Sequence, residues 1–140
     1  MSRIFWDTNL YIYLIEGRSA SAKQVETLRD KMRVRGDVLF TSTLTLGEAL
    51  VKPLAQGNQR LASEFQKGIA ASSTLIPFDE KAAWTYARLR SDGSLRAPDA
   101  IQLACAATVG VDLFVTNDIR LHSKQIPGIQ FIAPLDRVPI

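Results

Sequence analysis

Four acidic side chains stand where short apolar runs end or helical patterns begin, and their chemistry suits a divalent cation. Asp7 ends the run IFWD, Asp118 follows LFVTN, and Glu48 and Asp99 come early in two segments with helical patterns. Carboxylates that crowd together repel one another, and proteins tolerate this cost mainly where a cation binds among them. Mg²⁺ and Mn²⁺ prefer such oxygen ligands, so the four acids suggest a magnesium or manganese site if the fold gathers them.

Each of the four acids also has a purely structural explanation. Asp7 can cap a helix, and Asp118 follows Asn117 in a pair typical of turns. Thr45 and Glu48 fit a capping box, in which a hydroxyl and a carboxylate three residues apart bond the first backbone N–H groups of a helix. Asp99 follows Pro98, where the positive end of a helix dipole favours an acid. Only their position in the fold can separate the two interpretations.

The pattern of apolar residues predicts strands that alternate with helices. Strands are expected at 4–7, 38–41, 74–78, 113–116 and, at an edge, 130–133. Helices are expected at 9–16, 21–35, 45–52, 58–71, 79–89 and 97–109, with Pro53 stopping the third and Gly110 ending the last.

This alternation predicts an α/β fold with a mostly parallel central sheet of four to five strands, flanked by helices, because parallel strands need crossover connections. Ligands of such open sheets bind beyond the carboxyl ends of the strands. Asp7, Glu48, Asp99 and Asp118 are all expected at that edge, so the fold favours one shared site.

Length and composition limit the remaining possibilities. A chain of 140 residues fits one domain, which we expect to span residues 1–140. The net charge of +3 is modest, yet if four acids were gathered in one pocket, 17 basic side chains would face only 10 other acids and would attract a polyanion. The first acid comes too early for a signal peptide, and no apolar run reaches the ~18 residues of a membrane span. We therefore expect a cytoplasmic location without membrane contact.

Zinc and thiol chemistry are not favoured. Cys105 is the only cysteine and lies among apolar residues in a helical pattern, which predicts a packing role. His122 is the only histidine, so no cluster of nitrogen and sulfur ligands is available.

The motifs around the four acids resemble those of PIN domains. They are DTN at Asp7, TLGE at Glu48, LRAPDAIQLACAATVG around Asp99 and LFVTND at Asp118. The resemblance extends from Arg3 to Pro134 and keeps the order and spacing of the motifs. Within the family, a chain without added domains is most similar to the VapC toxins of bacterial and archaeal toxin–antitoxin pairs.

The resemblance implies a metal-dependent endoribonuclease in which Asp7, Asp99 and Asp118 hold one or two Mg²⁺ or Mn²⁺ ions and Glu48 completes the catalytic site. Asn9 and Thr116 stand beside these acids and could orient them or a water molecule, and Arg96 could contact the phosphate of RNA. The implied partners are an RNA substrate, a small cognate antitoxin that inserts a segment into the acidic cleft, and a second copy of the chain in a homodimer.

Three alternatives have different sequence requirements. A haloacid-dehalogenase-like phosphatase needs a second acid two residues after the first, where this chain has Asn9. A receiver domain needs adjacent acids after its first strand and a lysine after its last, and both are missing. A PIN fold that binds RNA or a partner without cleaving is the serious alternative, although such modules usually lack part of the acidic quartet.

Overall fold

The central sheet of the computed structural model, which describes all residues 1–140, contains five strands that pair in parallel in the order β3-β2-β1-β4-β5. The strands are β1 (Arg3–Trp6), β2 (Val38–Ser42), β3 (Thr74–Ile76), β4 (Val111–Val115) and β5 (Ile129–Ala133). The expected α/β class is confirmed, and the fifth strand lies at an edge as predicted.

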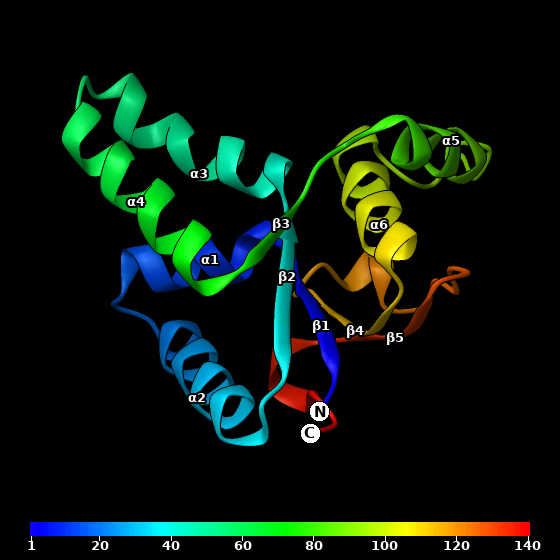
Figure 1. Cartoon of the computed structure of the whole chain (residues 1–140), viewed down its shortest axis with the longest axis horizontal. Coiled ribbons are helices and arrows are strands. Elements are labelled where there is room, and N and C mark those ends of the chain that lie inside the picture. The colour runs from blue at the N-terminus through cyan, green and yellow to red at the C-terminus, as the bar shows by residue number, and fades with distance from the viewer.

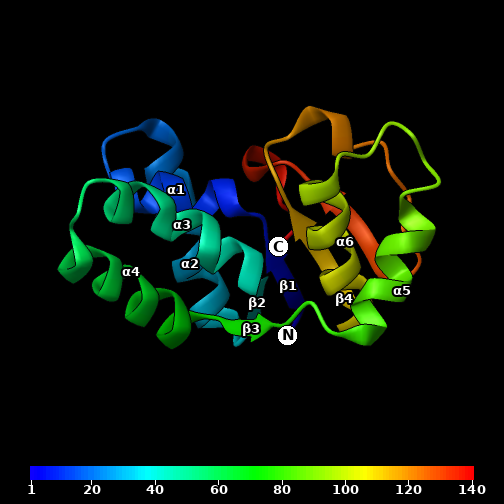
Figure 2. The same ribbon diagram turned by 90° about the horizontal axis from the view of Figure 1, so that it is seen from above.

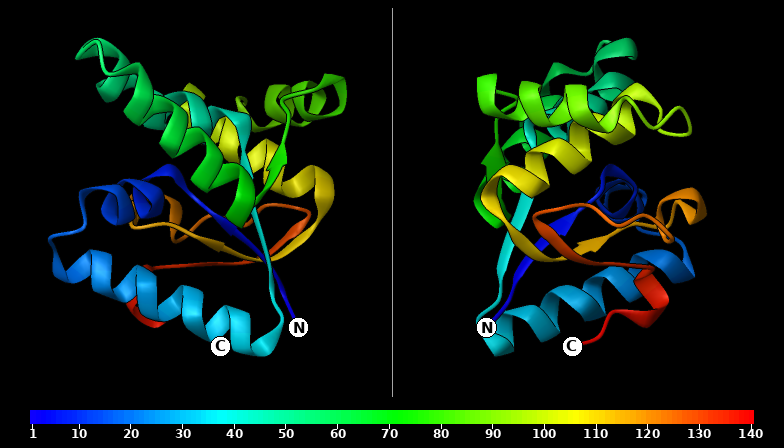
Figure 3. Two further views of the ribbon diagram at one scale, coloured as in Figure 1. Left: turned by 60° about the vertical axis from the view of Figure 1, so that its left-hand side comes forward. Right: turned by 90° about the vertical axis from the view of Figure 1, so that its right-hand side faces the viewer.

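Six helices connect the strands and cover both faces of the sheet (Figure 1). They are α1 (Thr8–Glu16), α2 (Ala20–Arg35), α3 (Thr43–Ala55), α4 (Gln59–Ser72), α5 (Glu80–Leu89) and α6 (Ala97–Val109). Seen from above, α1 to α4 lie on one side of the sheet, with α5 and α6 on the other (Figure 2). The paired helices α3 and α4 extend outward from the sheet (Figure 3). None of the helices combines the length and apolar character that a membrane crossing requires.

The alternation of side chains along β1 divides the core into two layers. Ile4 and Trp6 point to the layer formed with α1, α2 and α4, where Leu10 and Met32 are fully buried. Phe5 points to the layer formed with α5 and α6, and its ring stacks on Phe114 of β4 at a centroid distance of 4.9 Å. Both faces of the central strand are therefore apolar, as expected for a parallel sheet covered by helices on each side.

Cys105 confirms its predicted packing role. It is buried in the layer between the sheet and α6, and its burial raises the pKa of the thiol to about 11. The side chain is therefore neutral and unreactive at physiological pH.

The predictions for the third helix were wrong at both ends. Ser42 rather than Thr45 caps α3, and its hydroxyl accepts from the Thr45 N–H at 3.4 Å. Pro53 does not stop the helix, which continues to Ala55. A proline in the last turn removes only one backbone donor, and the Pro53 side chain is buried, so packing offsets that loss.

Two glycines offer a matched test of how closely β5 approaches α6. Gly128 and Gly36 both have positive φ, at 96° and 76°. A Cβ atom at Gly128 would stand 2.6 Å from the Ala107 carbonyl oxygen in α6, whereas one at Gly36 would meet open space.

Gly128→Ala should therefore destabilise the protein more than Gly36→Ala. We expect about 1 kcal/mol for Gly36→Ala, from backbone strain alone, and about 2–4 kcal/mol for Gly128→Ala, which adds a steric clash. Urea unfolding of both variants measures the difference. Equal losses of unfolding free energy in the two variants would show that the backbone at Gly128 shifts freely enough to avoid the clash.

Candidate active site

Asp7 occupies the carboxyl end of the central strand and is also the N-cap of α1. Its carboxylate accepts from the Thr8 N–H at 2.8 Å and from the Thr116 hydroxyl at 2.7 Å, and only 9% of the residue is exposed. Burial raises the pKa of Asp7; the hydrogen bonds from Thr116 and Thr8 oppose this shift, while the charges of Asp99 and Glu48 add to it. Asp7 thus has the capping role of its structural interpretation and also lies close to two of the other acids.

Thr116 fixes the Asp7 carboxylate from the neighbouring strand end. Thr116 is fully buried, and its hydroxyl also accepts from the Asp118 N–H at 3.0 Å. Asn9 donates to the same hydroxyl at 3.5 Å, while its Oδ1 is buried without a hydrogen-bond partner. Both residues therefore lie beside the acids, as the sequence predicted.

Gln102 was missed in the sequence and joins three elements at the base of the site. Its side-chain amide donates to Thr8 Oγ1 at 2.9 Å, to Thr45 Oγ1 at 2.7 Å and, more weakly, to Asp7 at 3.4 Å. Its amide oxygen accepts from the Ser42 hydroxyl. Gln102 lies three residues after Asp99 on α6, a spacing that places both on one helix face and could have revealed it.

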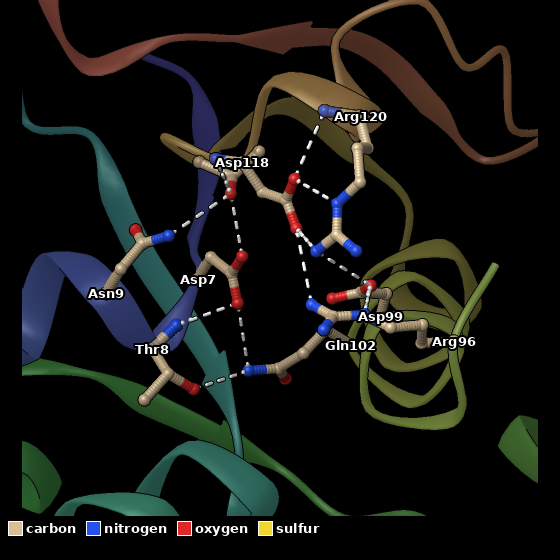
Figure 4. Close-up of polar contacts among 9 residues, drawn as sticks. Asp7, Thr8, Asn9, Arg96, Asp99, Gln102, Asp118 and Arg120 are labelled. Carbon is tan, nitrogen blue, oxygen red and sulfur yellow. Dashed lines mark hydrogen bonds and ion pairs between the residues drawn. The ribbon is translucent and has the colours of Figure 1, made fainter. Parts of the chain in front are cut away.

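Asp99 and Asp118 are paired with two arginines, as Figure 4 shows. Arg120 donates from Nε to Asp118 at 2.9 Å, and Arg96 donates from Nε to Asp99 at 3.3 Å. Each guanidinium also lies within 4 Å of the other acid, at 3.7 Å for Arg96 and Asp118 and at 3.9 Å for Arg120 and Asp99. The hydrogen bond from Arg120 lowers the pKa of Asp118. The role of Arg120 was not predicted, although it follows Asp118 by only two residues.

Glu48 is the most exposed of the four acids. It lies in the second turn of α3 and accepts from the Thr8 hydroxyl at 2.6 Å. Thr8 therefore connects Glu48 to Gln102 and, through its own backbone N–H, to Asp7.

These residues enclose one pocket of about 420 Å³ whose lining is polar apart from Pro98. The sequence-predicted residues that line it are Asp7, Asn9, Glu48, Arg96, Asp99 and Asp118. Thr8, Pro98 and Gln102 complete the wall, and Thr116 supports it through its bond to Asp7. The fold thus brings the four acids to one edge, as expected from the parallel sheet.

The side-chain oxygens of this pocket are of the chemical type that binds a hard divalent cation. Carboxylates are the oxygen ligands that Mg²⁺ and Mn²⁺ prefer, and the unpartnered Asn9 Oδ1 is a further acceptor for a ligand or its water. However, no three acidic, imidazole or thiol groups stand close enough to share one ion as they are placed. In this arrangement two of the acids use Arg96 and Arg120 as counterions.

Comparison with known proteins gives one family match. Residues 4–126 match the model of the family described as PIN domain. No curated protein matches the sequence.

Solved structures share the fold at low sequence identity. The chain is similar to a DNA-bound VapBC from Salmonella typhimurium, with 20% identity, a TM-score of 0.71 and coverage of 96% of this chain and 99% of that chain. It is also similar to VapBC2 from Rickettsia felis, bound to a promoter DNA fragment, with 17% identity, a TM-score of 0.70 and coverage of 94% and 98%. A third is VapBC-5 of the VapBC toxin–antitoxin systems, from Mycobacterium tuberculosis, with 20% identity, a TM-score of 0.62 and coverage of 94% and 98%.

The opposite pKa shifts of Asp7 and Asp118 generate a stability test in metal-free buffer. The raised pKa of Asp7 means that the folded state disfavours its charge, so the free energy of unfolding falls as pH rises above the unfolded pKa of about 3.9. Asp7→Asn keeps a capping residue and removes this penalty. The variant should therefore melt above wild type at pH 7, and the difference should narrow as pH falls toward about 4.

Asp118→Asn is the matched control, because the folded state favours the charge of Asp118. Losing its bonds with Arg120 should lower the melting temperature at pH 7. Scanning calorimetry in EDTA measures both variants. If Asp7→Asn melted below wild type to the same extent as Asp118→Asn, the hydrogen bonds that the charged carboxylate accepts from Thr116 and Thr8 would outweigh the cost of its burial.

Proposed function

Because the chain belongs to the PIN domain family, we propose that it is a Mg²⁺- or Mn²⁺-dependent endoribonuclease and the toxin of a VapBC-type toxin–antitoxin pair. The observation that carries this proposal is the polar pocket in which carboxylates from four separate elements meet. Such a concentration of acid has little value for stability, and it suits a site that holds a cation against a phosphate.

In this proposal Asp7, Asp99 and Asp118 hold the ion and Glu48 completes the site. When bound, the ion would make water a stronger nucleophile and neutralise charge on the phosphate. The chain itself contributes fixed geometry: Thr116 and Gln102 hold the Asp7 carboxylate, and Asn9 Oδ1 offers an acceptor for the attacking water. Water adds to phosphorus, the bond to the 3′ oxygen breaks and that oxygen takes a proton, which leaves a 5′-phosphate and a 3′-hydroxyl.

Under this proposal, Arg96 and Arg120 can pair either with the acids of the pocket or with a phosphate of the RNA. Both guanidinium groups are more than half exposed while they bind Asp99 and Asp118. A cation among the acids would release them, and a phosphate of the RNA backbone would be their natural new partner. The predicted phosphate contact of Arg96 thus extends to Arg120.

A second function is favoured by the same arginine pairs. With Arg96 and Arg120 neutralising two acids, the pocket could serve a PIN-fold module that binds RNA or a partner without cleaving it. The two functions differ in whether metal produces new RNA ends.

We expect the purified protein, freed of any partner, to cleave RNA with Mg²⁺ or Mn²⁺ and to stop in EDTA. Asp99→Asn should reduce the rate by about 100-fold or more, since even supporting residues of metal sites contribute about 10- to 100-fold. Denaturing gels with end-group analysis of the products measure both effects.

Asp30→Asn provides the matched control for this experiment. Asp30 also pairs with an arginine three residues away on one helix, Arg33, but it is exposed and remote from the pocket. Its removal should leave cleavage unchanged. Full activity in EDTA would exclude the metal mechanism, and RNA binding without cleavage in any metal would establish the non-cleaving module.

A groove near the acidic pocket supports the proposed antitoxin partner. It has a volume of about 260 Å³ and is lined by apolar side chains of α1 and α4, including Leu14, Phe65 and Ile69, with two arginines of α2 on its wall. Two buried donors on its wall, Trp6 Nε1 and Arg29 Nε, have no hydrogen-bond partner. Arg29 is half-buried, because it packs over this groove and donates to the Ser72 carbonyl.

A second pocket connects this groove to the acidic pocket. It shares Ile15 and Phe65 with the groove and Glu48 with the acidic pocket. A partner segment with apolar side chains and a hydrogen-bond acceptor could fill the groove and continue toward the acids. The solved relatives include chains from toxin–antitoxin systems, which is consistent with such a partner.

Gly68→Leu tests the groove without disturbing the fold. Gly68 lies on α4 in the groove wall, and a Cβ atom there would have no neighbour within 4 Å. The larger side chain should fill the groove and weaken binding of the cognate antitoxin, while RNA cleavage persists. Titration calorimetry with the antitoxin measures the loss of affinity. Unchanged affinity would show that the partner binds another surface.

The homodimer and the cytoplasmic location remain part of this proposal. Val51 and Leu54 on α3 are 65% and 53% exposed, as expected for apolar side chains that a second copy would cover. An RNA-cleaving toxin would need to reach cellular RNA, which is consistent with the cytoplasm.

A further inference from the structure

The outer face of α5 carries aromatic and basic side chains that the proposed active site does not use. Trp84 is 69% exposed, and the Arg88 guanidinium lies 6.0 Å from the centroid of its ring. Arg90 lies 5.9 Å from the ring centroid of Tyr86, which meets Phe78 edge-on at 5.6 Å. Lys81, Trp84 and Arg88 are spaced three and four residues apart, are all exposed and share one face of α5, which we call the aromatic strip, whereas Tyr86 and Arg90 lie on another face.

The charges along this strip lack acidic partners. Lys81, Arg88 and Arg90 make no ion pair, whereas α5 has its only acid, Glu80, in its first turn. Asp79, before the helix, is the N-cap and accepts from the Ala82 N–H. The later turns of α5 therefore present positive charge beside exposed aromatic rings.

In the sequence, α5 is followed closely by the helix that carries Asp99 of the acidic pocket. α5 packs against α6, a seven-residue connection, 90–96, joins the last turn of α5 to the first turn of α6, and that first turn carries Asp99 (Figure 2). The connection begins with Arg90 and ends with Arg96, and both are exposed. Arg90 and Arg96 thus stand at the two ends of the connection between α5 and the rim of the pocket, and the one acid between them, Asp92, is paired with Lys124.

We propose that the aromatic strip binds single-stranded RNA by stacking unpaired bases on Trp84 and its neighbouring guanidinium, beside the acidic pocket. The inference rests on the proposed RNA substrate and specifies how that substrate is recognised. Aromatic rings and arginine planes stack on unpaired bases of any sequence, while the basic side chains attract the phosphates. Bases within a duplex are already stacked and paired, so the strip selects unpaired segments.

A second copy of the chain fits this surface less well. In a symmetric dimer the same patch faces itself, so Lys81 and Arg88 would oppose the same cations of the partner. Like charges brought together across an interface cost several kcal/mol. A polyanion provides the complementary charge instead.

The test uses the tryptophan content of the chain. There are two tryptophans, of which Trp6 is 1% exposed and Trp84 is 69% exposed. Titration with a short unstructured single-stranded RNA in EDTA should quench the fluorescence of the wild-type protein. Trp84→Phe should bind the RNA within about threefold of wild type, since phenylalanine also stacks, but the quenching should disappear because only Trp6 remains.

Trp84→Ala should bind the same labelled RNA about 5- to 150-fold more weakly, as measured by fluorescence anisotropy, with an unchanged salt dependence. Arg88→Ala should reduce the slope of log affinity against log salt by about 1, because one phosphate contact is lost. Phe131→Ala is the control, since Phe131 is a similarly exposed aromatic residue (63%) on β5, outside the strip, and its affinity should equal that of wild type.

Wild-type affinity in Trp84→Ala, or equal binding of single-stranded RNA and its duplex, would overturn the inference. These outcomes are independent of cleavage, because all binding is measured without metal. If the wild-type protein cleaved RNA with Mg²⁺ while Trp84→Ala bound normally, the proposed function would stand without the strip. If the strip bound RNA but no metal supported cleavage, the strip would belong to a non-cleaving module.

Discussion

The buried carboxylate of Asp7 is the interaction on which the arrangement of the site depends. Asp7 ends the central strand, and β1 pairs with β2 on one side and β4 on the other. Hydrogen bonds link its carboxylate to Thr116 after β4 and to Gln102 on α6. A buried carboxylate costs free energy unless hydrogen bonds compensate it. The three elements must therefore keep their relative positions, and Asp99 and Asp118 are placed by two of these elements.

Charge balance divides the four acids into two groups. Asp99 and Asp118 face Arg96 and Arg120, so their charges are compensated within the chain. Asp7 has no such counterion, and the charges of Asp99 and Glu48 raise its pKa beyond the effect of burial. A cation bound beside Asp7 would relieve this cost.

The sequence predicted the place of the acids better than their contacts. Parallel strands bring their carboxyl ends to one edge, so Asp7 and Asp118 could be placed together from the strand pattern alone. Gln102 looks like any polar residue on an amphipathic helix, and only the packing of α6 beside Ser42 and Thr45 shows that it is 2% exposed and fully bonded. Thr45 was misplaced for a related reason, because its hydroxyl bonds to Thr41 in the core rather than to the backbone at the start of α3.

Glu48 differs from the other acids in how firmly it is held. Asp7, Asp99 and Asp118 each stand within a residue or a helical turn of a strand end or helix start, whereas Glu48 is exposed in the second turn of α3. Its only hydrogen bond comes from the Thr8 hydroxyl, which also accepts from Gln102. Glu48 additionally lines the pocket that leads to the apolar groove. Glu48 lines both this pocket and the acidic pocket, so a group that fills the neighbouring pocket can contact it. The Thr8 hydroxyl then links such a contact to Gln102, and the Thr8 backbone N–H links it to Asp7.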